Sequence, residues 1–146
     1  MSTVYHILKR KGHEVFSVGP EVSVYDGLEI LVDKKIGCLM VTDGMNKYLG
    51  TFTERDYARK VVLKGRSSKE TTVGEIMDPH PSVTEDSTIE ECMEKMSAKG
   101  FRHLPVMDRK GNLIGVVSIS DVVKFIIDEQ KFLLEHMGDY ISGTHH

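Results

Sequence analysis

The pattern of hydrophobic and polar positions passes through the same series of elements twice. In each half of the chain a short extended piece, "VFSV" at 15–18 or "PSV" at 81–83, leads into a segment with apolar residues at helical spacing. Two short apolar runs separated by a polar turn follow, at 38–52 or 103–117, and a second helical segment comes after them. Each half therefore predicts the order β-α-β-β-α. The apolar helical positions are Val24, Leu28, Leu31 and Val32, then Ile89, Met93 and Met96.

The two halves are copies of one repeat. Residues 17–63 and 82–128 align at a constant offset of 65 without a gap, and nine of the forty-seven positions are identical, where average composition gives about three. The clearest stretches are "GTFTERD" at 50–56 and "GVVSISD" at 115–121, each with a glycine, β-formers, a hydroxyl residue and an aspartate. One copy has too little interior to be stable alone. We therefore expect the two copies to pack their sheets together as a pseudo-twofold pair.

The sequence divides into five segments around these repeats, and the predicted fold class is α/β (α+β). The linker is polar and contains Gly and Ser. The C-terminal helix carries more apolar surface than one repeat needs, which favours a dimer face there. The segments are an N-terminal helical segment (1–14), the first repeat (15–65), a linker (66–79), the second repeat (80–130), and a C-terminal helix and tail (131–146).

Thr53 and Ser118 stand where a predicted strand ends and a helix begins, and this corner has two interpretations. In the first, the hydroxyl and the aspartate three residues later form a capping box. The spacing alone favours this interpretation, although Asp reaches back less far than the usual Glu or Gln. In the second, the free N–H groups of the helix bind phosphate and the aspartate accepts hydrogen bonds from a ribose diol. Ser23 and Thr88 are placed to cap the two earlier helices.

A family resemblance favours the second interpretation. The doubled unit, the two corner motifs and "RHLPVMD" at 102–108 before a Gly-containing turn together resemble a tandem pair of CBS domains, a Bateman module. The likeness covers about residues 15–130, and the layout is similar to that of small stand-alone two-CBS-domain proteins. The resemblance implies a regulatory module, for example in energy sensing, that binds AMP, ADP, ATP, NAD(H) or S-adenosylmethionine between its repeats. It implies no catalysis.

The resemblance also implies two clefts, named here by their aspartates. In the Asp121 cleft, Asp121 holds the ribose hydroxyls. The residues that face the phosphates there are Ser118, Ser120, Arg102 and His103, and those beside adenine are Val15, Phe16, Ile36 and Gly37. In the Asp56 cleft, Asp56 holds ribose. Thr53 and Arg55 lie nearer the phosphate, and adenine lies among Met77, Pro79, Phe101 and Arg102.

The first copy departs from the pattern, because it has Gly37 and Cys38 where the second copy has Arg102 and His103. The Asp56 cleft therefore contains less positive charge and is predicted to be the weaker. His103 is either a core histidine or a phosphate contact. As a phosphate contact it predicts that nucleotide affinity falls as pH rises from 6 to 8, since the imidazole loses its proton. The basic stretch "KRKGH" at 9–13 favours a solvated face, with contact to a phosphate tail as the alternative.

Composition narrows the class of partner. The chain has 146 residues, 40% of them hydrophobic, which is enough for a real core. A formal net charge of −3 and a pI of about 6.2 disfavour a nucleic-acid partner. Cys38 and Cys92 lie far apart in sequence and suggest neither a disulfide nor a zinc site, which favours a reducing compartment. With no long apolar run and no signal-peptide pattern, we expect a soluble, cytoplasmic protein.

Two alternatives to a ligand sensor remain. An enzyme is disfavoured, because the sequence contains no GxSxG, HExxH or GxxxxGK[ST] motif and no evident grouping of a carboxylate with a nucleophile and a base. We expect no catalytic residue and no metal. A ligand-independent dimerisation or adaptor protein with the same fold is the second alternative. The expected partners are an adenosine-containing small molecule, a second copy in a homodimer and an unidentified regulated protein.

Overall fold

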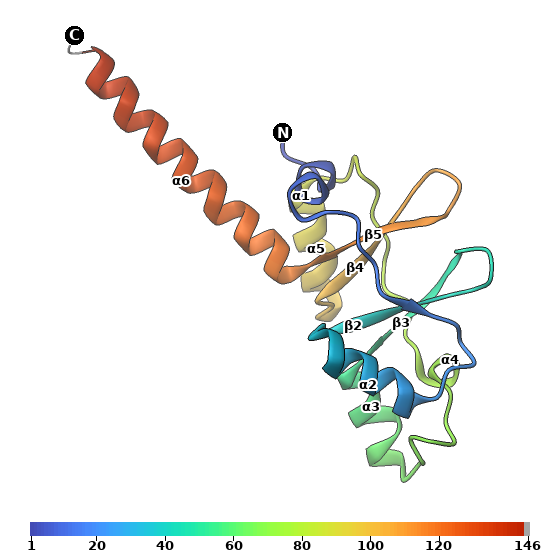
Figure 1. Ribbon diagram of the computed structural model, residues 1–146. Helices are drawn as coiled ribbons and strands as arrows, with labels where there is room; N and C mark the ends of the chain where they lie inside the picture. The colour runs from blue at the N-terminus through green and yellow to red at the C-terminus, as the bar shows by residue number, and fades with distance from the viewer. Residues whose placement is uncertain (145–146) are drawn as a thin grey trace.

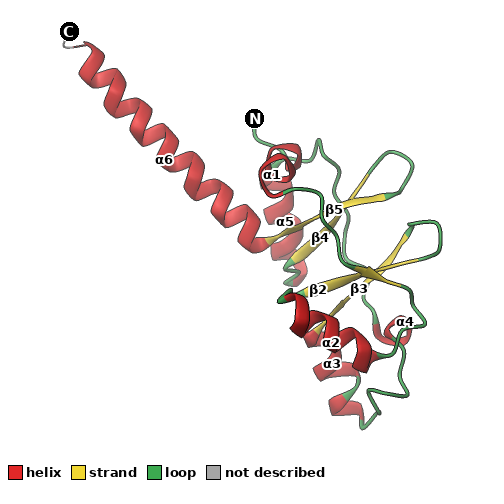
Figure 2. Ribbon diagram, in the orientation of Figure 1, coloured by secondary structure: helices red, strands yellow, loops and turns green. Residues whose placement is uncertain are grey.

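The two repeats fold as neighbouring units, each with a small sheet and helices against it (Figure 1). The computed structural model describes the backbone of residues 1–144 and the side chains of residues 1–138. Helices lie around both hairpins (Figure 2). The elements are, in chain order, α1 (Val4–Lys11), β1 (Ser17–Val18), α2 (Val24–Lys34), β2 (Cys38–Thr42), β3 (Tyr48–Thr53), α3 (Glu54–Lys60), η1 (Val62–Lys64), α4 (Val73–Ile76), α5 (Ile89–Lys99), β4 (His103–Met107), β5 (Leu113–Ser118) and α6 (Ile119–Thr144).

Strand pairing is the same in both repeats, which confirms the predicted repeat. β1 lies parallel to β2, and β2 pairs antiparallel with β3, with Cys38 opposite Thr53. β4 pairs antiparallel with β5 in the equivalent register, with His103 opposite Ser118. In place of a counterpart to β1, Val83 forms a single parallel bridge to β4.

Side-chain caps begin the helices that follow the first strand of each repeat. Ser23 Oγ accepts a hydrogen bond from the Asp26 N–H at 3.1 Å, and Thr88 Oγ1 accepts one from the Glu91 N–H at 3.1 Å. Each bond satisfies a backbone donor that the helix itself cannot pair. Both predicted caps are therefore confirmed.

Two segments differ from the sequence prediction. The run "ERDYARKVVL" at 54–63 predicts one helix, but α3 ends at Lys60. The buried Val61 is its C-terminal cap, with φ −116° and ψ −67°, and the short helix η1 follows. The linker contains a helix that was not predicted, α4. Its first turn is closed by a capping box in which the Thr72 N–H donates to Glu75 Oε2 at 2.7 Å. The sequence "TTVGE" at 71–75 contains the capping-box pattern, a Thr followed three residues later by a Glu.

The segment that precedes each repeat packs on the other repeat. α1 comes before the first repeat, yet Val4, Ile7 and Leu8 are buried in the core of the second, with α5, β4, β5 and α6. α4 comes before the second repeat, and Val73 and Ile76 are buried in the core of the first. The two units are therefore held together by an exchange of short helices as well as by their sheets.

The repeated motif begins with glycine because of this exchange. A Cβ on Gly50 would lie 2.9 Å from Met77 Cγ, and a Cβ on Gly115 would lie 3.0 Å from Leu8 Cδ2. Real Cβ atoms rarely approach so closely, so a larger side chain at either position would push the crossing segment away.

A small third core joins the two sheets. Its buried members are Cys38 and Met40 from β2 and Leu113 from β5, and residues from both repeats pack around them. Asn46 Nδ2 also donates to the Leu113 carbonyl at 3.1 Å, between the two hairpins. The predicted packing of the two copies as a pair is confirmed.

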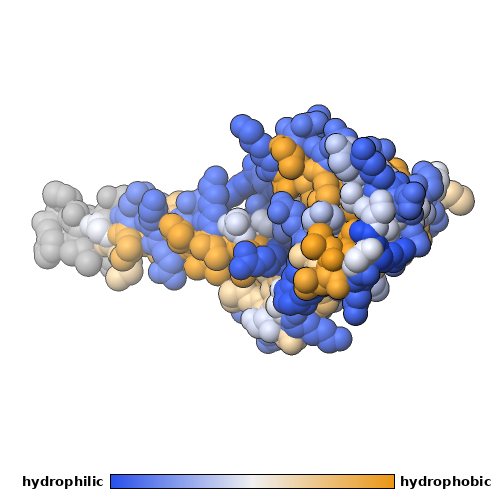
Figure 3. Space-filling view, turned by 90° about the horizontal axis from the view of Figure 1, so that it is seen from below, coloured by the Kyte–Doolittle hydropathy of each residue, from blue (hydrophilic) through white to orange (hydrophobic). Residues whose placement is uncertain are grey.

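α6 begins in the second repeat and then extends away from the rest of the molecule (Figure 1). Val122 and Phe125 are buried, whereas every side chain from Lys131 to Gly138 is exposed. Apolar side chains form a band along this projecting helix (Figure 3). The large exposed ones are Val123, Ile127, Phe132, Leu133, Leu134 and Met137. No helix in the described part of the chain combines the length and apolar character needed to cross a membrane.

Candidate functional site

Both strand-to-helix corners form capping boxes. At the first corner the Thr53 N–H donates to Asp56 Oδ2 at 3.0 Å, and the Asp56 N–H donates back to Thr53 Oγ1 at 3.3 Å. At the second, the corresponding distances are 2.8 Å from the Ser118 N–H to Asp121 Oδ2 and 3.1 Å for the return bond. The capping box that the spacing alone favoured is therefore present at both corners, although Asp reaches back less far than Glu or Gln. The extended backbone of Thr53, with φ −132° and ψ 166°, brings its N–H to the shorter side chain.

The two aspartates differ in how many of their carboxylate oxygens already have a bonding partner. Asp56 has a side chain only 10% exposed and both oxygens engaged, with Oδ1 3.3 Å from Lys60 Nζ. The Asp121 side chain is 22% exposed, and Lys11 Nζ approaches the same Oδ2 that accepts from Ser118, at 2.7 Å. Asp121 Oδ1 has no hydrogen-bond partner among the described residues. A ligand hydroxyl can therefore donate to that oxygen without breaking the capping box.

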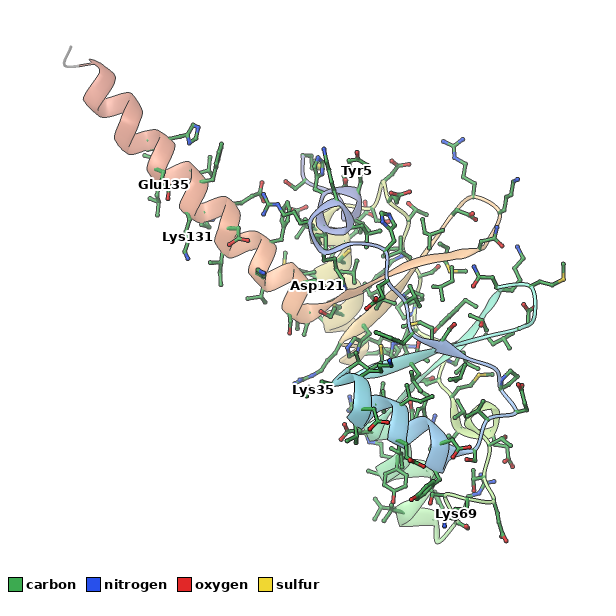
Figure 4. All side chains as sticks on the ribbon, viewed as in Figure 1. Tyr5, Lys35, Lys69, Asp121, Lys131 and Glu135 are labelled. Carbon is green, nitrogen blue, oxygen red and sulfur yellow. The ribbon has the colours of Figure 1, made fainter. Side chains whose placement is uncertain are left out.

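A cavity of about 290 Å³ opens beside the second corner. This volume lies at the small end of the range for small-molecule sites. Six of the residues that the resemblance assigns to the Asp121 cleft line it together: Val15, Phe16, Ile36, Gly37, His103 and Ser118. Asp121 lines an adjoining cavity of about 160 Å³, and Lys11 lines both cavities. Asp121 lies at the end of α6 that meets the body of the molecule (Figure 4).

His103 stands at the wall of the cavity as a neutral side chain. Mainly through burial, the pKa of His103 is lowered to about 4. Nearby His80 and Lys11 also contribute to the lowering of this pKa, and the negative charge of Asp121 raises it in part. The ring packs against Gly37, where a Cβ would lie 3.1 Å from both Cε1 and Nε2. At pH 6 to 8 the imidazole therefore offers hydrogen bonds and no positive charge, which differs from the protonated phosphate contact considered from the sequence.

Two residues assigned to the same phosphates lie apart from the cavity wall. Ser120 is exposed on the first turn of α6, and Arg102 is exposed in the loop before β4. Neither lines the 290 Å³ cavity. The Arg102 carbonyl accepts the Ile119 N–H at 2.9 Å, which ties the loop to the start of α6. This contact places the Arg102 backbone near the corner, while its side chain lies on the surface.

The Asp56 cleft is arranged differently. Phe101, assigned to adenine there, is covered on one side by the His80 ring, with 4.4 Å between centroids. His80 Nδ1 donates to the His103 carbonyl at 2.7 Å, which fixes the ring in place. Met77 packs against Gly50, and Pro79 is exposed. The remaining residues of this cleft are Thr53, which closes the capping box, and Arg55, which is exposed on α3.

The comparison with known families agrees with this arrangement. The model of the CBS domain matches residues 4–63 and 73–128, and these ranges include both corners and both sheets. The chain belongs to the CBS domain family. Both matched ranges contain one strand-to-helix corner, so each CBS domain contributes one candidate cleft.

This chain is similar to several named proteins that contain CBS domains. The mitochondrial CBS domain-containing protein CBSX3 of Arabidopsis thaliana is 35% identical over 97% of this chain and 73% of its own length. The structure of a protein with CBS domains from Burkholderia ambifaria is 46% identical, with a TM-score of 0.83 over 88% of this chain and 96% of that one. The structure of CBSX2 in complex with AMP is 27% identical, with a TM-score of 0.73 over 89% of this chain and 99% of that one.

Sequence reasoning missed several residues of the cleft. Lys11 is the last residue of α1, and Glu14 lies between α1 and β1. Cys38, Met40 and Val116 come from the paired strands. The three strand residues could have been found from the repeat, because they neighbour assigned positions. Lys11 lies in the basic stretch 9–13, for which the sequence favoured a solvated face, and its place beside Asp121 depends on α1 crossing to the second CBS domain.

The two cysteines are buried and unbridged. Burial raises the pKa of Cys38 to about 12 and that of Cys92 to about 11, so neither is a thiolate at neutral pH. Among the described residues no group of three or more His, Cys, Asp or Glu side chains is placed to hold a metal ion.

Proposed function

We propose that this CBS pair is a regulatory module that binds an adenosine-containing nucleotide, AMP, ADP, ATP or NAD(H), in the Asp121 cleft and signals occupancy to a partner protein. The observation that carries the proposal is the 290 Å³ cavity, where the segment before β1, the start of β2 and the β5–α6 corner meet. A relative with a similar fold, CBSX2, was solved with AMP.

Each part of such a ligand has a matching group in the cleft. At the N-terminus of the long helix α6 the Ser118, Ile119 and Asp121 N–H groups already have partners, so the feature that attracts phosphate is the positive end of the helix dipole. The Ser118 hydroxyl accepts from Asp121 N–H and keeps its own hydrogen for a further acceptor. Asp121 Oδ1 is free to accept from ribose. Phe16 and Ile36 supply apolar wall for a base.

α1 could transmit the binding of a ligand in the Asp121 cleft to the projecting helix α6. Besides the Lys11 contact to Asp121, Arg10 Nη1 lies 3.6 Å from Asp128 Oδ2 and its guanidinium stacks 4.8 Å from the Phe125 ring centre. A ligand shifts a protein between two conformations only if it binds one of them more tightly than the other. A nucleotide that prefers one position of α1 would therefore also bias α6.

The two aspartates provide the test. Asp121→Ala should abolish most of the thermal stabilisation by AMP, whereas Asp56→Ala should leave a substantial part, because the Asp56 carboxylate is already engaged and Phe101 is covered by His80. Differential scanning fluorimetry at subsaturating AMP measures this, since stabilisation follows RT ln(1 + [L]/Kd).

Each midpoint is compared with that of the same variant without AMP, because both substitutions break a capping box. Equal loss in the two variants would contradict the ranking of the clefts. Full stabilisation in both would contradict nucleotide binding at these corners and would favour the adaptor alternative. GMP serves as the base control.

The proposal includes a homodimer with a second copy of the chain. Its support is the band of exposed apolar side chains on α6, which the body of the molecule leaves uncovered (Figure 3). Monomeric proteins rarely expose an apolar surface of this extent without a partner.

A further inference from the structure

Lys11 holds a position between the two adjoining cavities. It is the last residue of α1, and Gly12 with φ 96° turns the chain away immediately after it. Its ammonium donates to Asp121 Oδ2 at 2.7 Å and to the Val116 carbonyl at 2.9 Å. Two of its three N–H donors are thus used on the carboxylate and strand that form the candidate ribose site.

The other charged groups around the 290 Å³ cavity do not supply this positive charge. Glu14, which also lines it, is acidic, and His103 is neutral near pH 7 because burial lowers its pKa to about 4. Arg102 is exposed and outside the lining, and Arg10 is occupied by Asp128 and Phe125. Among the described lining residues, Lys11 is the one cationic side chain.

Ribose hydroxyls that donate to the free Asp121 Oδ1 would share the charge of this carboxylate with Lys11, which is bonded to Oδ2. An uncharged nucleoside would leave the ammonium with a weakened partner beside a cavity, which is unfavourable. A ligand with a phosphate would give the ammonium a new anion at charge-assisted hydrogen-bond distance.

We propose that Lys11 is the specificity-determining residue of the Asp121 cleft and selects phosphorylated adenosine ligands over uncharged adenosine. This inference rests on the proposed function and adds the chemical class that the cleft accepts. It assigns a role to a residue 110 positions away from the aspartate that it contacts.

The test is the ratio of the dissociation constants for adenosine and AMP, measured by titration calorimetry. At pH 7.5 the AMP phosphate is largely a dianion, because its second pKa is about 6. In Lys11→Met the ratio should fall by about tenfold or more, with AMP bound more weakly and adenosine bound equally well or more tightly. Lys11→Arg, which keeps the charge, should retain most of the selectivity.

Lys9→Met is the matched control, since Lys9 is exposed on the same helix and carries the same charge. It should leave the ratio unchanged. An unchanged ratio in Lys11→Met, or a parallel loss of both ligands, would overturn the role of Lys11 while leaving nucleotide binding intact. Failure of the wild-type protein to bind either ligand would overturn the proposed function and this inference with it.

Discussion

At the scale of single residues, the environment decides what His103 does. The sequence places it beside Arg102 and upstream of the corner motif, which allowed a cationic phosphate contact. In the fold its ring is packed against Gly37, and the charges of His80, Asp121, Lys11 and Arg102 influence its pKa. Burial is the largest of these influences and lowers its pKa from 6.5 to about 4. The neutral form is therefore part of the folded state.

This lowered pKa predicts a stability change with pH. Between pH 6.5 and 4 the unfolded chain binds a proton at His103 that the folded chain does not, so folding weakens as pH falls through that window. From pH 7.5 to 5 the wild-type protein should lose about 2 kcal/mol more unfolding free energy than His103→Gln. Urea denaturation at each pH measures the difference. Parallel pH curves for the two proteins would contradict a lowered pKa.

At the scale of elements, the repeated corner combines two roles that the sequence presented as alternatives. Both corners form capping boxes, yet only the Asp121 corner leaves one carboxylate oxygen free beside a cavity. One motif therefore starts a helix in both repeats, and its surroundings decide whether it can also bind a ligand. The difference comes from Lys60 and His80 at the Asp56 corner and from Lys11 at the Asp121 corner.

The capping role predicts a defined loss of stability. Thr53→Ala removes the acceptor for the Asp56 N–H and should lower the unfolding free energy by about 1 kcal/mol. Urea denaturation without ligand measures it. Ser97→Ala, at an exposed position within α5, is the control and should cost nothing measurable. Equal unfolding free energies for Thr53→Ala and wild type would show that the hydroxyl contributes no cap.

At the scale of the whole molecule, the uncovered part of α6 is the feature that supports the proposed homodimer. Four of its exposed apolar residues are separated by four, seven and three positions, a spacing that keeps them on one side of a helix. The members of this series are Val123, Ile127, Leu134 and Met137, with Gln130 between them. Lys131 and Glu135 lie on the same projecting stretch (Figure 4).

We therefore expect the homodimer to depend on this helix face. The wild-type chain should sediment as a dimer at tens of micromolar, and Leu134→Lys should shift it to monomer, because a charge would be placed in the apolar contact. Glu135→Lys introduces the same side chain one position along and should leave the dimer intact. A wild-type monomer, with or without nucleotide, would refute the dimer; a dimer in Leu134→Lys would move it to another surface.

The sequence by itself determined the repeat, its order of elements, the caps at Ser23 and Thr88 and the fold class. These features depend on periodicity and on hydrogen bonds between residues a few positions apart, so the local sequence is enough to predict them. The packing of the two repeats against each other also follows from the sequence, because each repeat exposes an apolar sheet face that must be covered.

Only the tertiary structure decided how the clefts differ. α1 crosses to the second repeat and brings Lys11 to Asp121, while the equivalent space near Phe101 is taken by His80. The pKa of His103 likewise depends on burial by segments distant in sequence. The physical reason is common to all three: charge and free volume at a site depend on which distant segments pack against it, and periodicity along the chain does not record that choice.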